Sequence, residues 1–218
     1  MSLVTAAQVK VYLPGLAAAG TDEDTALATL ITRAEAAIAR YCGYPPASDG
    51  ATPTMASTSY TLYVRARVPE SSPSWGDGPE GYRTLRLPVR PVTAVASVYS
   101  DIDESYPAST LVASTDYTRD GNTGELRLKT TAVLGSWSPE KRAQKVACTA
   151  GFVTAPDDLI HAICLLAATY HKRRPDTGVE RQATGDKSSR EMEKGLPKEV
   201  RELLDEGGFV LPGKWWGE

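Results

Sequence analysis

Residues 157–174 read DDLIHAICLLAATYHKRR, and this stretch decides the fold of the chain. Between Leu159 and Ala168 its residues are apolar on nearly every side of a helix, and a helix that is apolar all round is buried all round. The segment is shorter than the roughly 20 residues that a helix needs to cross a bilayer. We therefore expect it to be the central helix of the protein, or to be buried partly by a neighbouring subunit.

A second long helix is predicted over Thr21–Tyr41. Three acidic residues stand in its first turn, where the helix dipole favours negative charge, and Gly43 follows its end. Its apolar residues recur at helical spacing and form one stripe. They are Leu27, Leu30, Ile31, Ala34, Ile38 and Tyr41. Shorter helices are predicted at residues 5–13 and 198–204.

The residues between the two long helices have the character of strands and turns. The clearest strand is ELRLK, residues 125–129, whose strict alternation indicates a sheet with one buried face. Asp120-Gly121 precedes it and suits a tight turn. Further strands are predicted at residues 60–65, 84–87, 92–99 and 145–150.

These patterns predict an α+β fold in which a helical base carries an inserted, antiparallel β-rich part. The base is expected to comprise residues 1–45 and 151–205, and the insert residues 46–150. Residues 175–195 are polar and mixed in charge, which is typical of a mobile segment. Residues 206–218 form a C-terminal tail.

Composition limits the classes of function. Of 218 residues, 41% are hydrophobic, and 24 basic against 27 acidic side chains give a net charge of −3. A protein that neutralises many DNA phosphates carries a basic surplus, so we expect any contact with DNA to be weak and transient. The three cysteines have no short spacing, so we expect neither a disulfide framework nor a zinc cluster.

No stretch of the sequence predicts a metal, cofactor or catalytic site. His161, Cys164 and His171 lie along one side of the central helix, but the helical rise places His171 roughly 10 Å beyond Cys164, too far to share an ion. The glycines of residues 76–81 match a dinucleotide-binding pattern, but Pro79 interrupts them and a strand follows. The acidic residues of 101–104 are most simply explained as a turn between strands.

Two segments are candidates for contact with partners. Lys172, Arg173 and Arg174 end the central helix, where positive charge stabilises the helix dipole; the alternative is that they face DNA in a channel. The tail is rich in apolar side chains, which at a chain terminus suggest docking, although it also has the alternative of folding back on its own domain. The partner-binding candidates in the tail are Phe209, Val210, Leu211, Trp215 and Trp216.

Several short stretches resemble one known family in their order and spacing. They are residues 9–13 (VKVYL), 30–35 (LITRAE), 38–44 (IARYCGY), 85–92 (LRLPVRPV), 97–98 (SV), 116–117 (DY), 124–128 (GELRL), 146–152 (VACTAGF) and 156–162 (PDDLIHA). Together they resemble the head–tail connector, or adaptor, proteins of tailed bacteriophages and gene transfer agents. The resemblance covers about residues 4–172.

The resemblance implies a structural protein of the virion neck, made in the host bacterial cytoplasm, and not an enzyme. It implies a ring of about twelve copies below the portal protein, closed by head-to-tail contacts. Such a ring extends the DNA channel and offers a platform for a stopper or tail-completion protein. The alternatives are a hydrolase with its site in the β-rich insert and a monomeric binding module.

Overall fold

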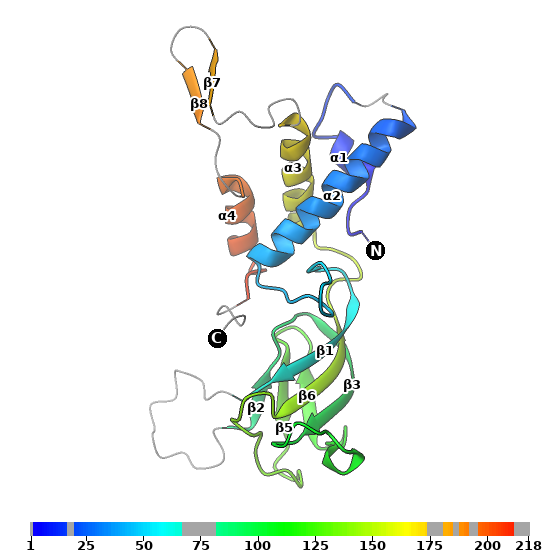
Figure 1. The fold of residues 1–218 in the computed structure, drawn as a ribbon, viewed down its shortest axis with the longest axis vertical. Helices are drawn as coiled ribbons and strands as arrows, with labels where there is room; N and C mark the ends of the chain where they lie inside the picture. Colours follow the sequence, from blue (N-terminus) through cyan, green and yellow to red (C-terminus); the bar gives the residue numbers. More distant parts are fainter. Residues whose placement is uncertain are drawn as a thin grey trace. The chain divides into compact units, whose positions relative to one another are not determined.

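The computed structural model of the protein describes residues 2–16, 20–66, 82–173, 181–184, 188–191 and 196–211 (Figure 1). The chain forms two compact units. A helical unit comprises Met1–Gly43 with Val153–Lys214, and a β unit includes Tyr44–Phe152. The predicted α+β class, with a helical base and an inserted antiparallel β-rich part, is confirmed.

The helical unit contains four described helices. They are α1 (Ala6–Lys10), α2 (Thr21–Tyr41), α3 (Asp157–Lys172) and α4 (Lys198–Glu206). The bounds of α2 are those predicted, α3 ends two residues earlier, α4 ends two residues later, and α1 is shorter than residues 5–13. Thr5 and Gln8 form a capping box at the start of α1. No helix in the described part of the chain is long and apolar enough to cross a membrane.

The helix α3 is central to its own unit, where it contacts α1, α2 and α4. Its buried residues are Leu159, Ala162, Ile163, Cys164, Leu166, Ala167 and Ala168. The apolar stripe of α2 supplies the facing side, since Leu27, Ile31, Ala34 and Ile38 are at most 2% exposed. Helices of the same chain therefore cover α3, and its apolar character does not require a neighbouring subunit.

Within residues 175–195, predicted from composition to be mobile, the structure describes a short antiparallel hairpin. Its strands are β7 (Arg181–Thr184) and β8 (Ser188–Glu191), which pair with each other and with no other described strand. Composition gave no sign of these strands because they contain almost no large apolar residue. The rest of the segment lies outside the described residues.

The β unit contains two three-stranded antiparallel sheets. The first has the order β1 (Thr58–Val64), β6 (Gln144–Ala150), β3 (Val92–Ser100). The second has the order β2 (Thr84–Arg86), β5 (Glu125–Leu128), β4 (Tyr117–Asp120). Each predicted strand is present within two residues of its predicted ends, whereas β4 was not predicted.

The two sheets share one hydrophobic core. Tyr60, Leu62 and Val146 contribute to it from the first sheet, and Leu85 and Leu126 from the second. Along β5 and β6, buried residues alternate with half-buried or exposed ones, whose side chains point outward. Because the sheets face each other across this core, their outer faces lie on opposite sides of the β unit.

The turn between β4 and β5 lies where it was predicted, but the residue with positive φ is not in the Asp120-Gly121 pair. Asp120 accepts backbone hydrogen bonds from Asn122 and Thr123. The left-handed residue is Gly124, at φ +72°, rather than Gly121. A Cβ atom on Gly124 would lie 2.6 Å from the carbonyl oxygen of Val89, so only glycine fits at this position.

Candidate interaction surfaces

The first part of the C-terminal tail packs into the helical unit. Phe209 and Leu211 are 8% and 6% exposed. The backbone N–H of Phe209 donates to the carbonyl of Leu204 at 3.0 Å, and that of Leu211 donates to the carbonyl of Cys42 at 2.9 Å. Half-buried Val210 lies between them. The tail predicted to begin at residue 206 is therefore anchored on its own unit as far as Leu211.

The remaining residues predicted to bind a partner, Trp215 and Trp216, lie outside the described residues. The alternative that the tail folds back on its own domain holds for Phe209 and Leu211. The apolar residues of the tail are the residue types expected both for docking to a partner and for packing in the protein's own core. Nothing in their spacing distinguishes the two uses.

At the C-terminal end of α3, Lys172 is exposed and Arg173 is half-buried, while Arg174 lies outside the described residues. His171 Nε2 lies 2.6 Å from Glu23 Oε1 in the first turn of α2. Lys172 and Arg173 follow the last buried turn of α3, where positive charge faces the negative end of the helix dipole. This end of α3 thus offers a small cationic surface.

The structure does not bring His161, Cys164 and His171 together. His161 Nδ1 lies 2.8 Å from the hydroxyl of Tyr12, and the buried thiol of Cys164 has its pKa raised by burial to about 11. Among the described residues, no group of three or more His, Cys, Asp or Glu side chains is placed to share a metal ion. The glycine pattern of residues 76–81 lies outside the described residues.

The outer face of the first sheet carries aromatic and cationic side chains in register. Lys145 of β6 stands between Tyr63 of β1 and Tyr99 of β3. The guanidinium of Arg142 lies 4.5 Å from the centre of the Tyr63 ring, and the amino group of Lys145 lies 5.8 Å from that of Tyr99. Tyrosine and arginine are enriched at interface hot spots. This face is therefore suited to protein contact.

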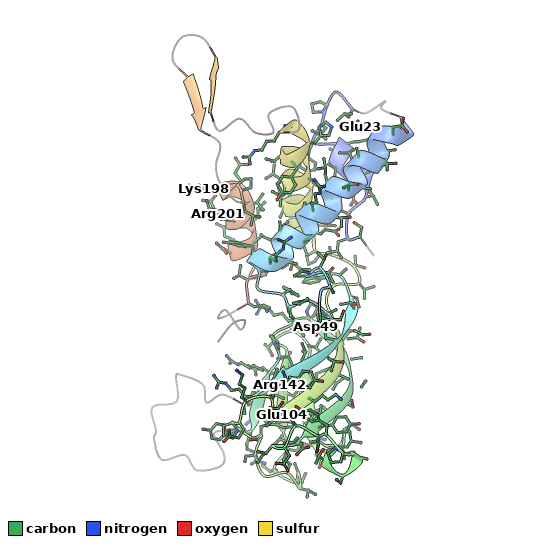
Figure 2. The ribbon with its side chains drawn as sticks, viewed as in Figure 1. Glu23, Asp49, Glu104, Arg142, Lys198 and Arg201 are labelled. Carbon is green, nitrogen blue, oxygen red and sulfur yellow. The ribbon has the colours of Figure 1, made fainter. Side chains whose placement is uncertain are left out.

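A structured acidic loop, residues 101–105, borders that face. The carboxylate of Asp101 accepts hydrogen bonds from the backbone N–H groups of Asp103, Ser105 and Tyr106 and from the hydroxyl of Ser105. The bond from Tyr106, followed by those from the other donors, holds the pKa of Asp101 below its ordinary value. Glu104 pairs with Arg142, whose Nε lies 2.9 Å from Glu104 Oε2. Both residues are labelled in Figure 2.

At the tip of the acidic loop Ile102 is 67% exposed. Glu104 and Tyr106 both adopt positive φ, at 56° and 50°, which residues with side chains rarely do. The predicted turn is therefore present, and its hydrogen bonds hold an apolar side chain and the carboxylate of Asp103 toward solvent.

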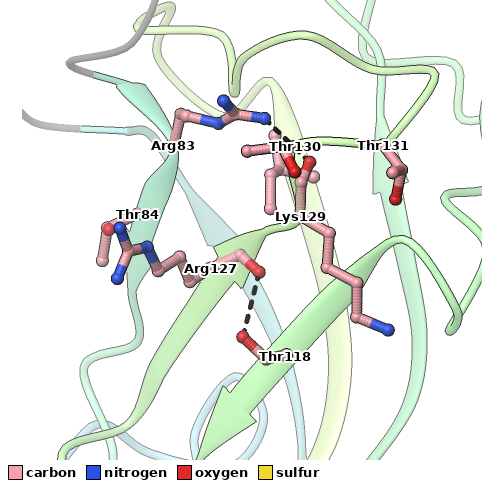
Figure 3. Close-up of a pocket in the computed structure, with 8 residues that line it drawn as sticks. Arg83, Thr84, Thr118, Arg127, Lys129, Thr130 and Thr131 are labelled. Atoms are coloured by element: carbon pink, nitrogen blue, oxygen red, sulfur yellow. Dashed lines mark hydrogen bonds between the residues drawn. The ribbon is translucent and has the colours of Figure 1, made fainter.

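The second sheet carries a basic pocket of about 590 Å³ (Figure 3). Its lining consists of three basic residues, four threonines and one leucine. These are Arg83, Thr84, Thr118, Arg127, Leu128, Lys129, Thr130 and Thr131. In register across the sheet, Arg127 of β5 stands between Thr84 of β2 and Thr118 of β4. The pocket therefore opens on the outer face, opposite the first sheet.

The positive charge of this pocket is not neutralised by the described part of the chain. Arg83 donates from Nη2 to the carbonyl of Lys129 at 2.8 Å, while its buried Nε has no hydrogen-bond partner there. No described carboxylate forms an ion pair with Arg83, Arg127 or Lys129. Figure 3 shows the side chains of Arg127 and Lys129 extending to opposite sides of the pocket. The pocket therefore presents positive charge toward solvent, which attracts negatively charged groups.

Sequence reasoning missed this pocket because its residues come from separate strands. Arg127 and Lys129 do stand two residues apart on the strand with the clearest alternation, which places them on one face. Arg83 joins them only through the pairing of β2 with β5. The pairing of strands is not encoded by any short motif.

Comparison with known proteins gives one assignment. The chain matches the model of the head completion protein family over residues 2–206. A comparison with curated proteins gives no match.

Two solved structures are similar to the chain. One, from the neck of a native gene transfer agent particle with C12 symmetry, is 20% identical over 83% of this chain and 82% of that chain, with a TM-score of 0.46. The other, from the virion of a native gene transfer agent particle, is 21% identical over 83% of this chain and 77% of that chain, with a TM-score of 0.44. Both overlaps are partial, so the assignment comes from the family match. That match extends through the four helices and eight strands that the structure describes, and the chain belongs to the head completion protein family.

Proposed function

We propose that the protein is a structural component of the virion neck, a head–tail connector that completes the DNA-filled head. The observation that carries the proposal is the family match over residues 2–206. The surfaces described above are compatible with this role, because they consist of tyrosines, cations and a structured loop rather than a set of reactive side chains. We propose no catalytic residue, cofactor or metal.

In the finer proposal, about twelve copies form a ring below the portal protein. Head-to-tail contacts that close on themselves form rings, and they require two different complementary surfaces on each subunit. The β unit offers two such different surfaces on its opposite faces. The ring extends the DNA channel and provides the platform on which a stopper or tail-completion protein assembles.

Contact with the genome is weak in this proposal. The net charge of −3 leaves few phosphates to be neutralised, so duplex DNA slides past the ring. Lys172, Arg173 and Arg174 are the proposed channel-facing residues. Replacing all three by glutamine is expected to reduce the already low affinity for short duplexes in filter binding, without loss of assembly.

Attachment to the portal is assigned to the end of the chain. Since Phe209 and Leu211 belong to the helical unit, the docking residues are Trp215 and Trp216. Replacing both tryptophans by alanine is expected to leave the unfolding transition unchanged and to reduce the retention of the protein on portal-bearing heads. Unchanged retention would remove the tail from the proposal.

The test of the function is deletion of the coding sequence in the parent particle. We expect DNA-filled heads without tails, and restoration of tailed particles by the full-length chain supplied in trans. Electron micrographs of negatively stained lysates score both outcomes. Complete, tailed and infectious or transducing particles without this protein would contradict the proposal.

A further inference from the structure

The basic pocket of the second sheet and the acidic loop that borders the first sheet are complementary in charge. The pocket presents Arg83, Arg127 and Lys129 without a described carboxylate partner. The loop presents the Asp103 carboxylate, which no described cation pairs, and the partly exposed Glu104. Each surface therefore lacks, within the described part of its own subunit, the charge that the other supplies.

The two surfaces are also complementary in apolar character. Ile102 at the loop tip is 67% exposed, and Val133, two residues beyond the pocket's Thr131, is 96% exposed. The pocket volume of about 590 Å³ exceeds what a single anion requires and is sufficient for the tip of a loop. An isoleucine flanked by carboxylates fits a site that combines aliphatic and cationic groups.

The loop is held in one conformation before it meets a partner. Three backbone N–H groups and the hydroxyl of Ser105 donate to Asp101 and hold the loop. The contact of Tyr106 with Tyr63, 5.7 Å between ring centres, attaches it to the first sheet. A loop that is already ordered loses little conformational entropy on binding. This favours the loop over a flexible acidic segment as the occupant of the pocket.

The positions of the two surfaces exclude a contact within one β unit and favour a contact between copies. The pocket opens on the outer face of the second sheet, and the loop follows β3 of the first sheet directly. The outer faces of sheets that share a core lie on opposite sides. A loop from one copy that enters the pocket of the next makes a heterologous contact, which is the kind that closes into a ring.

We propose that the acidic loop of one subunit docks in the basic pocket of its neighbour, with Asp103 near Arg127 and Lys129. This proposal rests on the ring of the proposed function and identifies its contact in the β unit. The occupant is a second copy of this chain rather than nucleic acid. Duplex DNA, whose phosphates would recognise the same cations, is tested as a competing occupant.

The test is a charge swap in the full-length chain, read out as incorporation into particle necks. Arg127→Glu and Asp103→Arg are each expected to lower incorporation by on the order of tenfold or more, because each places like charges together. The double variant carrying both changes is expected to recover most of the loss, since the interaction is restored with reversed sign. Arg65→Glu, an exposed arginine of the same unit outside the pocket, is the matched control and is expected to incorporate normally.

Crosslinking provides a second readout, which reports the distance between the two positions in assembled particles. The native cysteines Cys42, Cys148 and Cys164 are all buried, so cysteines introduced at Asp103 and Lys129 react selectively. Oxidation of particles carrying both is expected to give a ladder of subunit multiples, and neither single variant gives more than a dimer.

The outcomes separate this proposal from the proposed function. Rings in the neck that tolerate both charge reversals and give no ladder would overturn the loop-in-pocket contact and leave the neck function intact. Loss of duplex DNA retention in Arg127→Glu, with normal incorporation, would show that the pocket binds phosphate and would also overturn it. Absence of the wild-type chain from particles would overturn both.

Discussion

The helical unit and the β unit of this protein use their side chains in opposite ways. The helical unit is closed by its own chain: α3 is covered by the other helices, and even Phe209 and Leu211 near the C-terminus are buried. The β unit places a row of tyrosines and cations on one outer face and, on the other, a basic pocket with which no described carboxylate pairs. The most apolar segment of the sequence is therefore covered by its own chain, whereas aromatic and charged side chains of the β unit face outward.

The largest effect is expected from removing the end of the helical core. Truncation after Glu206 deletes Phe209 and Leu211, whose burial stabilises the unit by roughly 1.5–3 kcal/mol each. Urea unfolding followed by circular dichroism at 222 nm measures the loss. Truncation after Leu211 is the control and is expected to leave the urea midpoint of unfolding unchanged. Equal stability of the two truncations would show that the tail residues are not part of this core.

A similar loss is expected in the β unit from Trp137→Ala. Trp137 is fully buried, and its Nε1 donates to the carbonyl of Arg83 at 3.0 Å. Deleting a buried tryptophan side chain costs about 3–5 kcal/mol. Amide hydrogen exchange is expected to increase in the β unit while α2 and α3 keep their protection. Uniform loss of protection would mean that the two units unfold together.

A pH-dependent effect of intermediate size is expected at alkaline pH. Burial raises the pKa of Cys148 to about 11 and that of its cross-strand neighbour Tyr60 to about 12. Both folded values lie above those of the unfolded chain, so folding favours the protonated forms. Their contribution is complete below about pH 8.5 and is lost as the pH rises through 11 and 12.

Urea midpoints measured from pH 7 to pH 11 test this expectation. Cys148→Ala removes one of the two groups, so its stability is expected to fall less steeply with pH than that of the wild type. Cys164 has a pKa of about 11 as well, and Cys164→Ala serves as the matched change in the helical unit. Parallel pH profiles for wild type and Cys148→Ala would contradict the assignment.

The smallest effect is expected at the contact between Glu23 of α2 and His171 of α3. Glu23→Gln keeps the shape of the side chain but removes the charge that faces His171 at 2.6 Å. Both side chains are partly exposed, so the loss is about 0.2–1 kcal/mol at neutral pH. The shift in thermal midpoint is measured against Glu202→Gln, which interrupts the exposed Lys198–Glu202 pair of α4. A large shift would mean that α2 and α3 depend on this pair rather than on packing.

The sequence predicted helices and strands correctly where the local apolar pattern matches the buried face of the element. The apolar stripe from Leu27 to Tyr41, with the acidic first turn before it and Gly43 after it, predicted α2, and alternation predicted β5 almost to the residue. The strand β4 was missed because its residues, Tyr117–Asp120, include a single buried side chain and so carry no period. Local signals therefore identified elements in which several side chains are buried.

The candidate surfaces were harder to predict for a different physical reason. The basic pocket requires Arg83 and Lys129, which are brought together by the pairing of β2 with β5. The apolar residues of the tail were interpreted as partner-binding, yet Leu211 is tied to Cys42 in the helical unit. In each case the missing information is a tertiary contact between residues far apart in the sequence.

The central claim is that this chain is a neck component whose β units join neighbouring copies. Reconstruction of the particle neck by electron cryomicroscopy tests it most directly. We expect a closed ring below the portal in which each copy places residues 101–105 in the pocket formed around Arg127 of the next. A neck without this chain, or a twofold dimer with identical surfaces in contact, would contradict it.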